Sequence, residues 1–469
     1  MTGEKITTRF APSPTGLLHL GNVRTALFNW LFARKVQGAF LLRIEDTDRA
    51  RESDSALATL IEDLIWLGLQ WDEGFGAGGA GGPYRQSERT ALYAKYYEQL
   101  QEHGRAYPCF CSPSELALAR KTQLAAGQAP RYPGTCARLT AEAVTRFRAQ
   151  GQQPSLRFRV PAGATIEFDD SVRGAQSFRN DDIGDFVIRR SDGSAAFFFC
   201  NAIDDALMGV TDVIRGEDHL SNTPRQILIL DALALRIPRY GHIALVLDEA
   251  GQPLSKRAGS LSVHALRERG YLPDAINNAL ARLGHTYEDP GFLETEDLIG
   301  GFSLSRLSRA PARFSLAQLD FWQREALHRT RVDDLWNWMG EPLRDLVPEA
   351  ARQIFIEAIR ANILLPEDAL AWANIIYRGP AELSQPASQA IAEAKPAYFR
   401  AASEALARHP DDFQRFIATL KANVAESGKR LFLPLRAALT GRVDGPELAA
   451  LYALLGAERL RARFQRHLR

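Results

Sequence analysis

The stretch that decides the fold is Ile6-Thr7-Thr8-Arg9-Phe10-Ala11, which is followed by Pro12-Ser13-Pro14-Thr15-Gly16 and then by His19-Leu20-Gly21-Asn22. The first six residues predict a short strand, and the Pro- and Gly-rich segment after them predicts a loop. Apolar residues then recur at helical spacing between residues 23 and 31, and Asn22 is expected to cap that helix. Phe40-Leu41-Leu42 is an unalternated apolar run typical of a buried parallel strand. Strand, helix and strand in this order predict a right-handed parallel crossover.

The acidic stretch Glu45-Asp46-Thr47-Asp48 comes directly after the second of these strands. Ligands of open α/β sheets bind beyond the carboxyl ends of the strands, so we expect the 12–21 loop and these acids at the mouth of one site. Gly16 and Gly21 have the spacing of a P-loop, but Asn22-Val23 replaces its Lys-Ser/Thr, which excludes that motif. His19 instead lies two residues before the glycine, at a predicted helix N-terminus that favours a bound anion.

Composition supports an ordinary globular enzyme. The chain has 469 residues, of which 46% are hydrophobic and 24% charged, and these values exclude a disordered, collagen-like or disulfide-scaffold protein. The net charge of +1 predicts no global attraction to nucleic acid, although residues 421–469 hold ten Lys/Arg against four acids. Four cysteines and the lack of a long apolar run predict a cytoplasmic protein with no membrane partner.

A second candidate phosphate-binding element is Pro253-Leu254-Ser255-Lys256-Arg257, which follows a predicted strand. A Lys on a loop at a sheet edge can hold polyphosphate oxygens as a mobile point charge. The order of the two elements resembles the two signatures of class I aminoacyl-tRNA synthetases, here Pro12 to Asn22 and Pro253 to Arg257.

Further blocks narrow this resemblance to the bacterial glutamyl-tRNA synthetase family. They are Arg9–Gly16, Arg43–Asp48, Val213–His219 and, in the tail, Leu431–Gly441 with Gly445–Leu448. The resemblance implies an α/β fold in which a Rossmann-type catalytic domain (1–104 and 201–260) is interrupted by an inserted α+β acceptor-stem-binding domain (105–200). It also implies a helical stem-contact region (261–326) and an all-helical anticodon-binding region (327–469).

The same resemblance implies a glutamate–tRNA ligase. Such an enzyme joins L-glutamate and ATP, with Mg²⁺ on the nucleotide, into glutamyl-adenylate and pyrophosphate, and then transfers the glutamyl group to the 3'-terminal adenosine of tRNA(Glu). His19 and Lys256 are the expected catalytic residues. The residues that match the ATP site are His19, Gly21, Asn22, Ser255, Lys256 and Arg257, and those that match the glutamate site are Arg9, Ser13, Glu45, Asn201 and Arg215. In the tail, Lys429, Arg430, Arg459, Arg461 and Arg463 are expected to contact tRNA phosphates.

Two departures from the family pattern bear on the site. Phe197 stands where the family usually has Tyr, so one possible hydrogen bond to glutamate is lost, and the Phe-rich run up to Cys200 is otherwise expected to form a core strand. Cys109, Cys111 and Cys136 match three zinc thiolates found in part of the family, but the position of the usual fourth ligand, a His, is occupied by Arg138. Arg has no lone pair to give, so we expect no metal site and regard zinc as an improbable cofactor, with Tyr132 or a water as the alternative fourth ligand.

Several alternatives stay open at the level of sequence. The enzyme could also charge tRNA(Gln), and the chain could instead be a tRNA-free nucleotidyltransferase or a non-catalytic tRNA-binding paralogue. The sequence does not assign either Arg to a particular carboxylate of glutamate. A monomer is the expected oligomeric state.

Overall fold

The computed structural model of this chain describes residues 5–47, 53–254 and 262–468. Its segments form two units, one made of residues 1–266 and 276–316 and the other of residues 267–275 and 317–469. The predicted fold class is confirmed, since an α/β unit with parallel strands is followed by a helical one. The predicted domain ranges themselves stay predictions.

The first sheet of the first unit contains the predicted crossover. β1 (Thr7–Phe10) pairs in parallel with β2 (Ala39–Leu42), and β2 pairs in parallel with β3 (Glu73–Gly74). α1 (Leu20–Lys35) joins the first two strands, and its residues are buried on almost every side. The expectation that Asn22 caps this helix is wrong: the N-cap is His19, because its imidazole Nδ1 accepts a hydrogen bond from the Asn22 backbone N–H at 3.3 Å.

A second sheet of the first unit has the order β7-β6-β10-β9. β9 (Asp212–Gly216) and β10 (Arg239–Ile243) are parallel and are joined through α8 (Thr223–Ala232). Thr211, just before β9, donates its backbone N–H to the carbonyl of Thr7 in β1 at 2.9 Å, which ties the two sheets together. The hairpin of β6 (Thr165–Asp170) and β7 (Gly174–Arg179) belongs here because Asp170 pairs with Tyr240 of β10. Both strands of this hairpin fall in the range 105–200 that the sequence analysis gave to the inserted domain.

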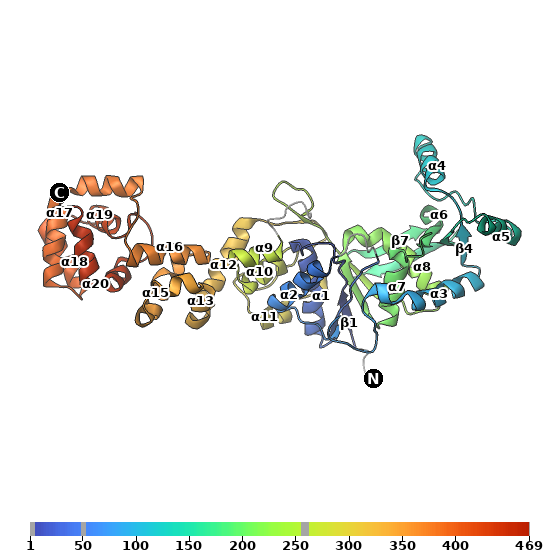
Figure 1. Cartoon of the computed structure of the whole chain (residues 1–469), viewed down its shortest axis with the longest axis horizontal. Helices are drawn as coiled ribbons and strands as arrows, with labels where there is room; N and C mark the ends of the chain where they lie inside the picture. The colour runs from blue at the N-terminus through green and yellow to red at the C-terminus, as the bar shows by residue number, and fades with distance from the viewer. Residues whose placement is uncertain (1–4, 48–52, 255–261, 469) are drawn as a thin grey trace. The chain divides into compact units, whose positions relative to one another are not determined.

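The inserted region builds its own antiparallel sheet, in the order β4-β5-β8. Its strands are β4 (Ala106–Cys109), β5 (Ser155–Phe158) and β8 (Phe186–Arg189). Two helices of this region, α4 (Pro113–Ala125) and α5 (Ala141–Ala149), have no buried residue, and α4 stands away from the sheet in Figure 1. The Phe-rich segment that follows forms helix α7 (Phe197–Leu207) and not the core strand that its unbroken apolar run had suggested.

The first unit contains further helices and strands. They are α2 (Asp54–Trp66), α3 (Thr90–Glu102), α6 (Asn180–Ile183), β11 (Val246–Leu247), α11 (Thr295–Gly301) and β12 (Ala312–Arg313). α9 (Val263–Arg269) and α10 (Pro273–Ala281) contain residues of both units.

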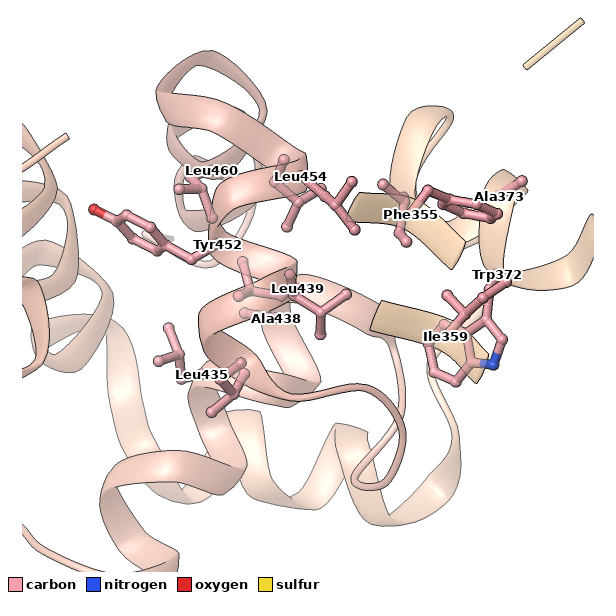
Figure 2. Packing of buried hydrophobic residues seen from close by; sticks show 14 of the residues in the cluster. Phe355, Ile359, Trp372, Ala373, Leu435, Ala438, Leu439, Tyr452, Leu454 and Leu460 are labelled. Carbon is pink, nitrogen blue, oxygen red and sulfur yellow. The ribbon is translucent and has the colours of Figure 1, made fainter. Parts of the chain in front are cut away.

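In its described part, the second unit is helical throughout, as predicted for the tail. Its helices are α12 (Leu316–Arg329), α13 (Val332–Trp338), α14 (Glu341–Arg344), α15 (Arg352–Ile359), α16 (Pro366–Tyr377), α17 (Gln385–Arg408), α18 (Phe413–Val424), α19 (Lys429–Thr440) and α20 (Leu448–Gln465). One apolar core joins most of them, and Figure 2 shows side chains of α15, α16, α19 and α20 meeting in it. α17 is broken at Lys395, whose φ of 62° lies outside the helical region directly before Pro396.

Arg463 of α20 lies inside this helical unit and is only 4% exposed. It donates hydrogen bonds to the carbonyl of Leu439 near the end of α19, and to those of Ile375 and Ile376 near the end of α16, at 2.5 and 2.7 Å. The last carbonyls of a helix have no partner within it, so this one side chain satisfies the ends of two helices. Burial lowers its pKa to about 10. The expectation that Arg463 contacts tRNA phosphates is therefore wrong, because its guanidinium is turned inward.

Candidate active site

A cavity of about 700 Å³ opens where β1, β2, β9 and β10 end. Every described residue that was predicted for catalysis, ATP binding or glutamate binding lines it: Arg9, Ser13, His19, Gly21, Asn22, Glu45, Asn201 and Arg215. Pro253 and Leu254, the start of the second signature, also line it. Ser255, Lys256 and Arg257 lie outside the described residues. On one side of the cavity the chain leaves β1 and runs toward β2, and on the other side it leaves β9 and runs toward β10. Ligands of open α/β sheets are expected at such strand ends.

His19 and Gly21 form the floor of the cavity at the start of α1. Because His19 accepts the Asn22 N–H at Nδ1, a neutral ring carries its proton on Nε2. A Cβ on Gly21 would lie 3.1 Å from Nδ1 and 3.2 Å from Cε1 of His19, closer than ordinary contact. A side chain at position 21 would therefore push the imidazole by a few tenths of an ångström.

A buried cluster of charges lies beside the cavity, and two of its members, Arg43 and Asp205, were not among the predicted site residues. Asp205 accepts hydrogen bonds from Arg9 Nε at 3.2 Å and from Arg43 Nη1 at 2.7 Å. Arg43 Nη2 also donates to Glu45 at 3.3 Å, and Asn201 Nδ2 donates to the same carboxylate oxygen. Arg43 belongs to the Arg43–Asp48 block that carries the family resemblance, whereas Asp205, near the end of α7, belongs to no motif.

This cluster sets the protonation of its two acids. Burial alone would raise the pKa of Asp205, but Arg43 and Arg9 together lower it. For Glu45 the balance is the opposite, since burial raises its pKa and the same two arginines oppose this only in part. Asp205 is thus ionised by its two arginine partners alone, whereas Glu45 would be kept ionised by a bound cation.

Arg215, which also lines the cavity, has different hydrogen-bond partners. Its Nη2 donates to Thr223 Oγ1 at 2.8 Å and to Gln226 Oε1 at 2.7 Å, and its Nε donates to His242 Nε2 at 3.2 Å. Its Nη1 is buried, and no group in the described part of the chain accepts from it. Burial lowers the pKa of Arg215 to about 10, which leaves it charged at neutral pH. A guanidinium with an unused buried donor is suited to a carboxylate ligand.

Phe197 and His219 form an aromatic wall of the same cavity. Their ring centroids lie 5.3 Å apart, and both rings line the cavity. Burial, with the Arg215 charge added, lowers the pKa of His219 to about 4, so this ring is neutral at pH 7. Phe197, where the sequence analysis expects a lost Tyr hydroxyl, therefore lines the cavity.

The three cysteines of the inserted region converge. The sulfurs of Cys109, Cys111 and Cys136 all lie within 4.8 Å of one another, and the hydroxyl of Tyr132 is 3.5 Å from the first two. Arg157 donates from Nε to Cys109 Sγ at 3.1 Å. Three thiols and a phenol oxygen make a donor set of the size that structural zinc requires. The expected absence of zinc stays a prediction, and the fourth donor in this geometry would be Tyr132.

The chain matches two family models. Residues 5–321 match the catalytic domain of tRNA synthetases class I (E and Q), and residues 332–468 match an anticodon binding domain. Among the described residues, no helix has both the length and the apolar character of a membrane span.

Similar proteins match over almost the whole chain. Glutamate–tRNA ligase 2 of Nitrosococcus oceani is 56% identical, and the match covers 99% of this chain and 98% of the relative. Glutamate–tRNA ligase 1 of Halorhodospira halophila is 53% identical over 99% of this chain and 97% of its own length. The crystal structure of a glutamate tRNA ligase from Elizabethkingia meningosepticum, in complex with its amino acid, is 29% identical with a TM-score of 0.89 and covers 99% of both chains.

The matched residues thus include the 12–22 loop, the strand ends around the cavity and the helical tail. The chain belongs to the glutamate and glutamine (E and Q) family of class I tRNA synthetases.

Proposed function

We propose that this chain is a glutamate–tRNA ligase that activates L-glutamate with ATP and transfers it to the 3'-terminal adenosine of tRNA(Glu), with release of AMP and pyrophosphate. Membership of the family and the names of the relatives support this activity. The chemistry of the cavity supports the choice of amino acid.

The observation that carries the proposal is the charge balance of the buried cluster. Arg9 and Arg43 face Asp205 and Glu45, whereas Arg215 faces only neutral partners. Among these five residues, three cations against two anions leave one positive charge, and Arg24 and Asp218, which line the cavity, add one charge of each sign. Glutamate brings one net negative charge at neutral pH. Glutamine, which is neutral overall, would leave a buried guanidinium uncompensated, and that costs several kcal/mol by general estimates.

The substrate groups then have partners of opposite charge within one cavity. Glu45 receives the α-ammonium, while Arg215, through its unused Nη1, and Arg9 receive the carboxylates. Ser13 and Asn201 add polar contacts. Nothing in this arrangement assigns a given carboxylate to a given arginine.

Catalysis in this proposal is electrostatic. Attack of the glutamate carboxylate on the α-phosphorus of ATP builds negative charge on the phosphate oxygens. His19 donates its Nε2–H there, and the N-terminal amides of α1 near Gly21 and Asn22 add positive potential. Lys256, with Ser255 and Arg257, stabilises the departing pyrophosphate, and Mg²⁺ bound to the nucleotide supplies further positive charge.

The second unit is proposed to bind the anticodon of the tRNA, with residues 327–469 as the binding region. The matching anticodon-binding family model supports this role. Lys429, Arg430, Arg459 and Arg461 are exposed, as phosphate contacts require. Charging of tRNA(Gln) is a second candidate activity that the sequence left open.

A charging assay tests the proposal. Purified tRNA(Glu) and tRNA(Gln) are each incubated with ATP and labelled glutamate or glutamine. Glutamylation of tRNA(Glu) with no glutaminylation is the expected result. ATP–pyrophosphate exchange in the absence of any tRNA, with no charging in its presence, would instead identify a tRNA-free nucleotidyltransferase.

The proposal also covers zinc in the inserted region, the oligomeric state and the cellular location. We keep the sequence-based expectation that the enzyme is a cytoplasmic monomer without zinc, and the free thiols of all four cysteines suit a reducing compartment. Metal analysis of protein purified without chelators tests the zinc expectation. About one zinc per chain, lost when Tyr132→Phe and Cys136→Ser are combined, would refute it and assign the cysteine cluster as the site.

A further inference from the structure

A buried chain of hydrogen bonds begins behind the cavity at Asp170, the last residue of β6. Its carboxylate accepts the backbone N–H groups of Val172 at 2.9 Å, Arg173 at 2.8 Å and His242 at 3.1 Å, and it lies 2.5 Å from Nδ1 of the His242 ring. Burial opposes ionisation of Asp170, yet these donors lower its pKa. An ionised carboxylate only accepts hydrogen bonds, so the network assigns the ring proton of His242 to Nδ1.

The opposite ring nitrogen of His242 is then an acceptor, and it faces Arg215. Nε2 receives Arg215 Nε–H at 3.2 Å and the hydroxyl of Thr223 at 3.0 Å. That hydroxyl oxygen in turn accepts from Arg215 Nη2 at 2.8 Å, so the directions of all three bonds agree. His242 has no exposed surface, and burial lowers its pKa, which keeps the ring neutral.

The partner that orients Arg215 is neutral, whereas the partners of Arg9 and Arg43 are charged. Arg9 and Arg43 are oriented by the carboxylate of Asp205, which also cancels part of their charge. Within the described ranges, Arg215 forms no ion pair with an acid. An imidazole acceptor fixes the direction of the guanidinium and leaves its charge available to a ligand.

We propose that Asp170 and His242 are positioning residues for the amino-acid substrate. Asp170 holds His242 in the Nδ1–H form, and His242 Nε2 orients Arg215 so that Nη1 points at a substrate carboxylate. This inference rests on the proposed function, because that function makes Arg215 a carboxylate ligand. Neither residue touches the substrate in this arrangement.

Two substitutions at His242 separate positioning from packing. In His242→Asn the amide nitrogen lies near the place of Nδ1 and keeps the bond to Asp170, but the acceptor for Arg215 is lost. In His242→Gln the amide oxygen reaches the place of Nε2 and restores that acceptor. We expect His242→Asn to raise KM for glutamate about tenfold or more, with KM for ATP within about twofold and kcat changed less than KM. His242→Gln should recover most of the glutamate KM.

His285→Asn is the matched control, since His285 is also buried in the first unit but does not line the cavity. It should leave KM for glutamate unchanged even if the melting temperature falls. If the Asn and Gln variants of His242 raise KM equally, or if neither does, His242 has only a packing role and the inference is wrong.

Asp170→Asn gives an independent test, including the case in which His242→Asn does not fold. An amide donor facing Nδ1 moves the ring proton to Nε2, where it opposes the Arg215 N–H, so KM for glutamate should again rise about tenfold. An unchanged KM in folded Asp170→Asn would overturn the inference. A wild-type enzyme that charges no tRNA with glutamate would refute the proposed function itself. An active wild-type enzyme whose His242 and Asp170 variants have an unchanged KM for glutamate would refute only the positioning role of these residues.

Discussion

Replacing Arg463 by Met should destabilise the second unit without directly affecting tRNA contacts. The substitution keeps a long apolar stem in the core but removes the donors to three helix-end carbonyls, those of Leu439, Ile375 and Ile376. At about 1 kcal/mol for each lost bond, the free energy of unfolding should fall by about 3 kcal/mol. For a unit of this size the melting temperature should then fall by about 6–12 °C.

Differential scanning calorimetry of the full chain measures this effect, and Arg461 supplies the control. Arg461 lies two residues earlier on the same helix and is exposed, so Arg461→Met should change the free energy of unfolding by no more than about 0.5 kcal/mol. In tRNA binding the order of the two effects should be reversed, so that Arg461→Met has the larger effect. Arg461→Met should reduce the salt dependence of tRNA affinity by about one ion, while Arg463→Met, measured well below its melting temperature, should leave that slope unchanged. Equal stability of Arg463→Met and wild type, or a reduced salt slope in that variant, would refute the capping role.

The remaining predictions concern the catalytic site. Gly21→Ala should displace the His19 ring and lower the adenylation rate more than ATP affinity, and an unchanged single-turnover rate would show that the ring has room to spare. Because burial raises the pKa of Glu45, its carboxylate is protonated at a higher pH than that of an exposed Glu. KM for glutamate should therefore rise as the pH falls toward 5. Glu45→Gln should remove most of that pH dependence. Lys256→Ala should slow adenylation about a hundredfold, equivalent to roughly 3 kcal/mol, while tRNA affinity measured by filter binding stays near the wild-type value; full adenylation activity would exclude Lys256 from the reaction.

The resemblance to the family, and not a local pattern, singled out Arg9, Glu45 and Arg215. The strand pattern predicted only that the ends of parallel strands meet at one edge of a sheet, and all three residues line the cavity at that edge. His19 was expected at a helix N-terminus, and only its capping role was missed, since an imidazole is a rarer cap than the Asn22 beside it.

What the sequence did not predict depends on contacts between distant segments. Asp205 lies on α7, whose Phe-rich start has no helical periodicity and suggested a strand. The β6–β7 hairpin joins β10 through pairing that no local pattern encodes. The inward turn of Arg463 depends on where α16 and α19 end, so its charge alone gave the wrong role.

The pairing of Arg9 with Asp205 sets an order of events during synthesis of the chain. The two residues are 196 positions apart. At about 5–20 residues per second, the carboxylate leaves the ribosome roughly 10–40 seconds after the arginine. For that interval Asp205 is missing, so Arg9 lacks the acid with which it pairs and Arg43 has only Glu45, and burial of these cations would cost several kcal/mol. The parallel crossover at the start of the chain therefore completes its packing only after the inserted region and α7 have been made, so a nascent chain that ends before α7 should retain an accessible, protease-sensitive amino-terminal segment.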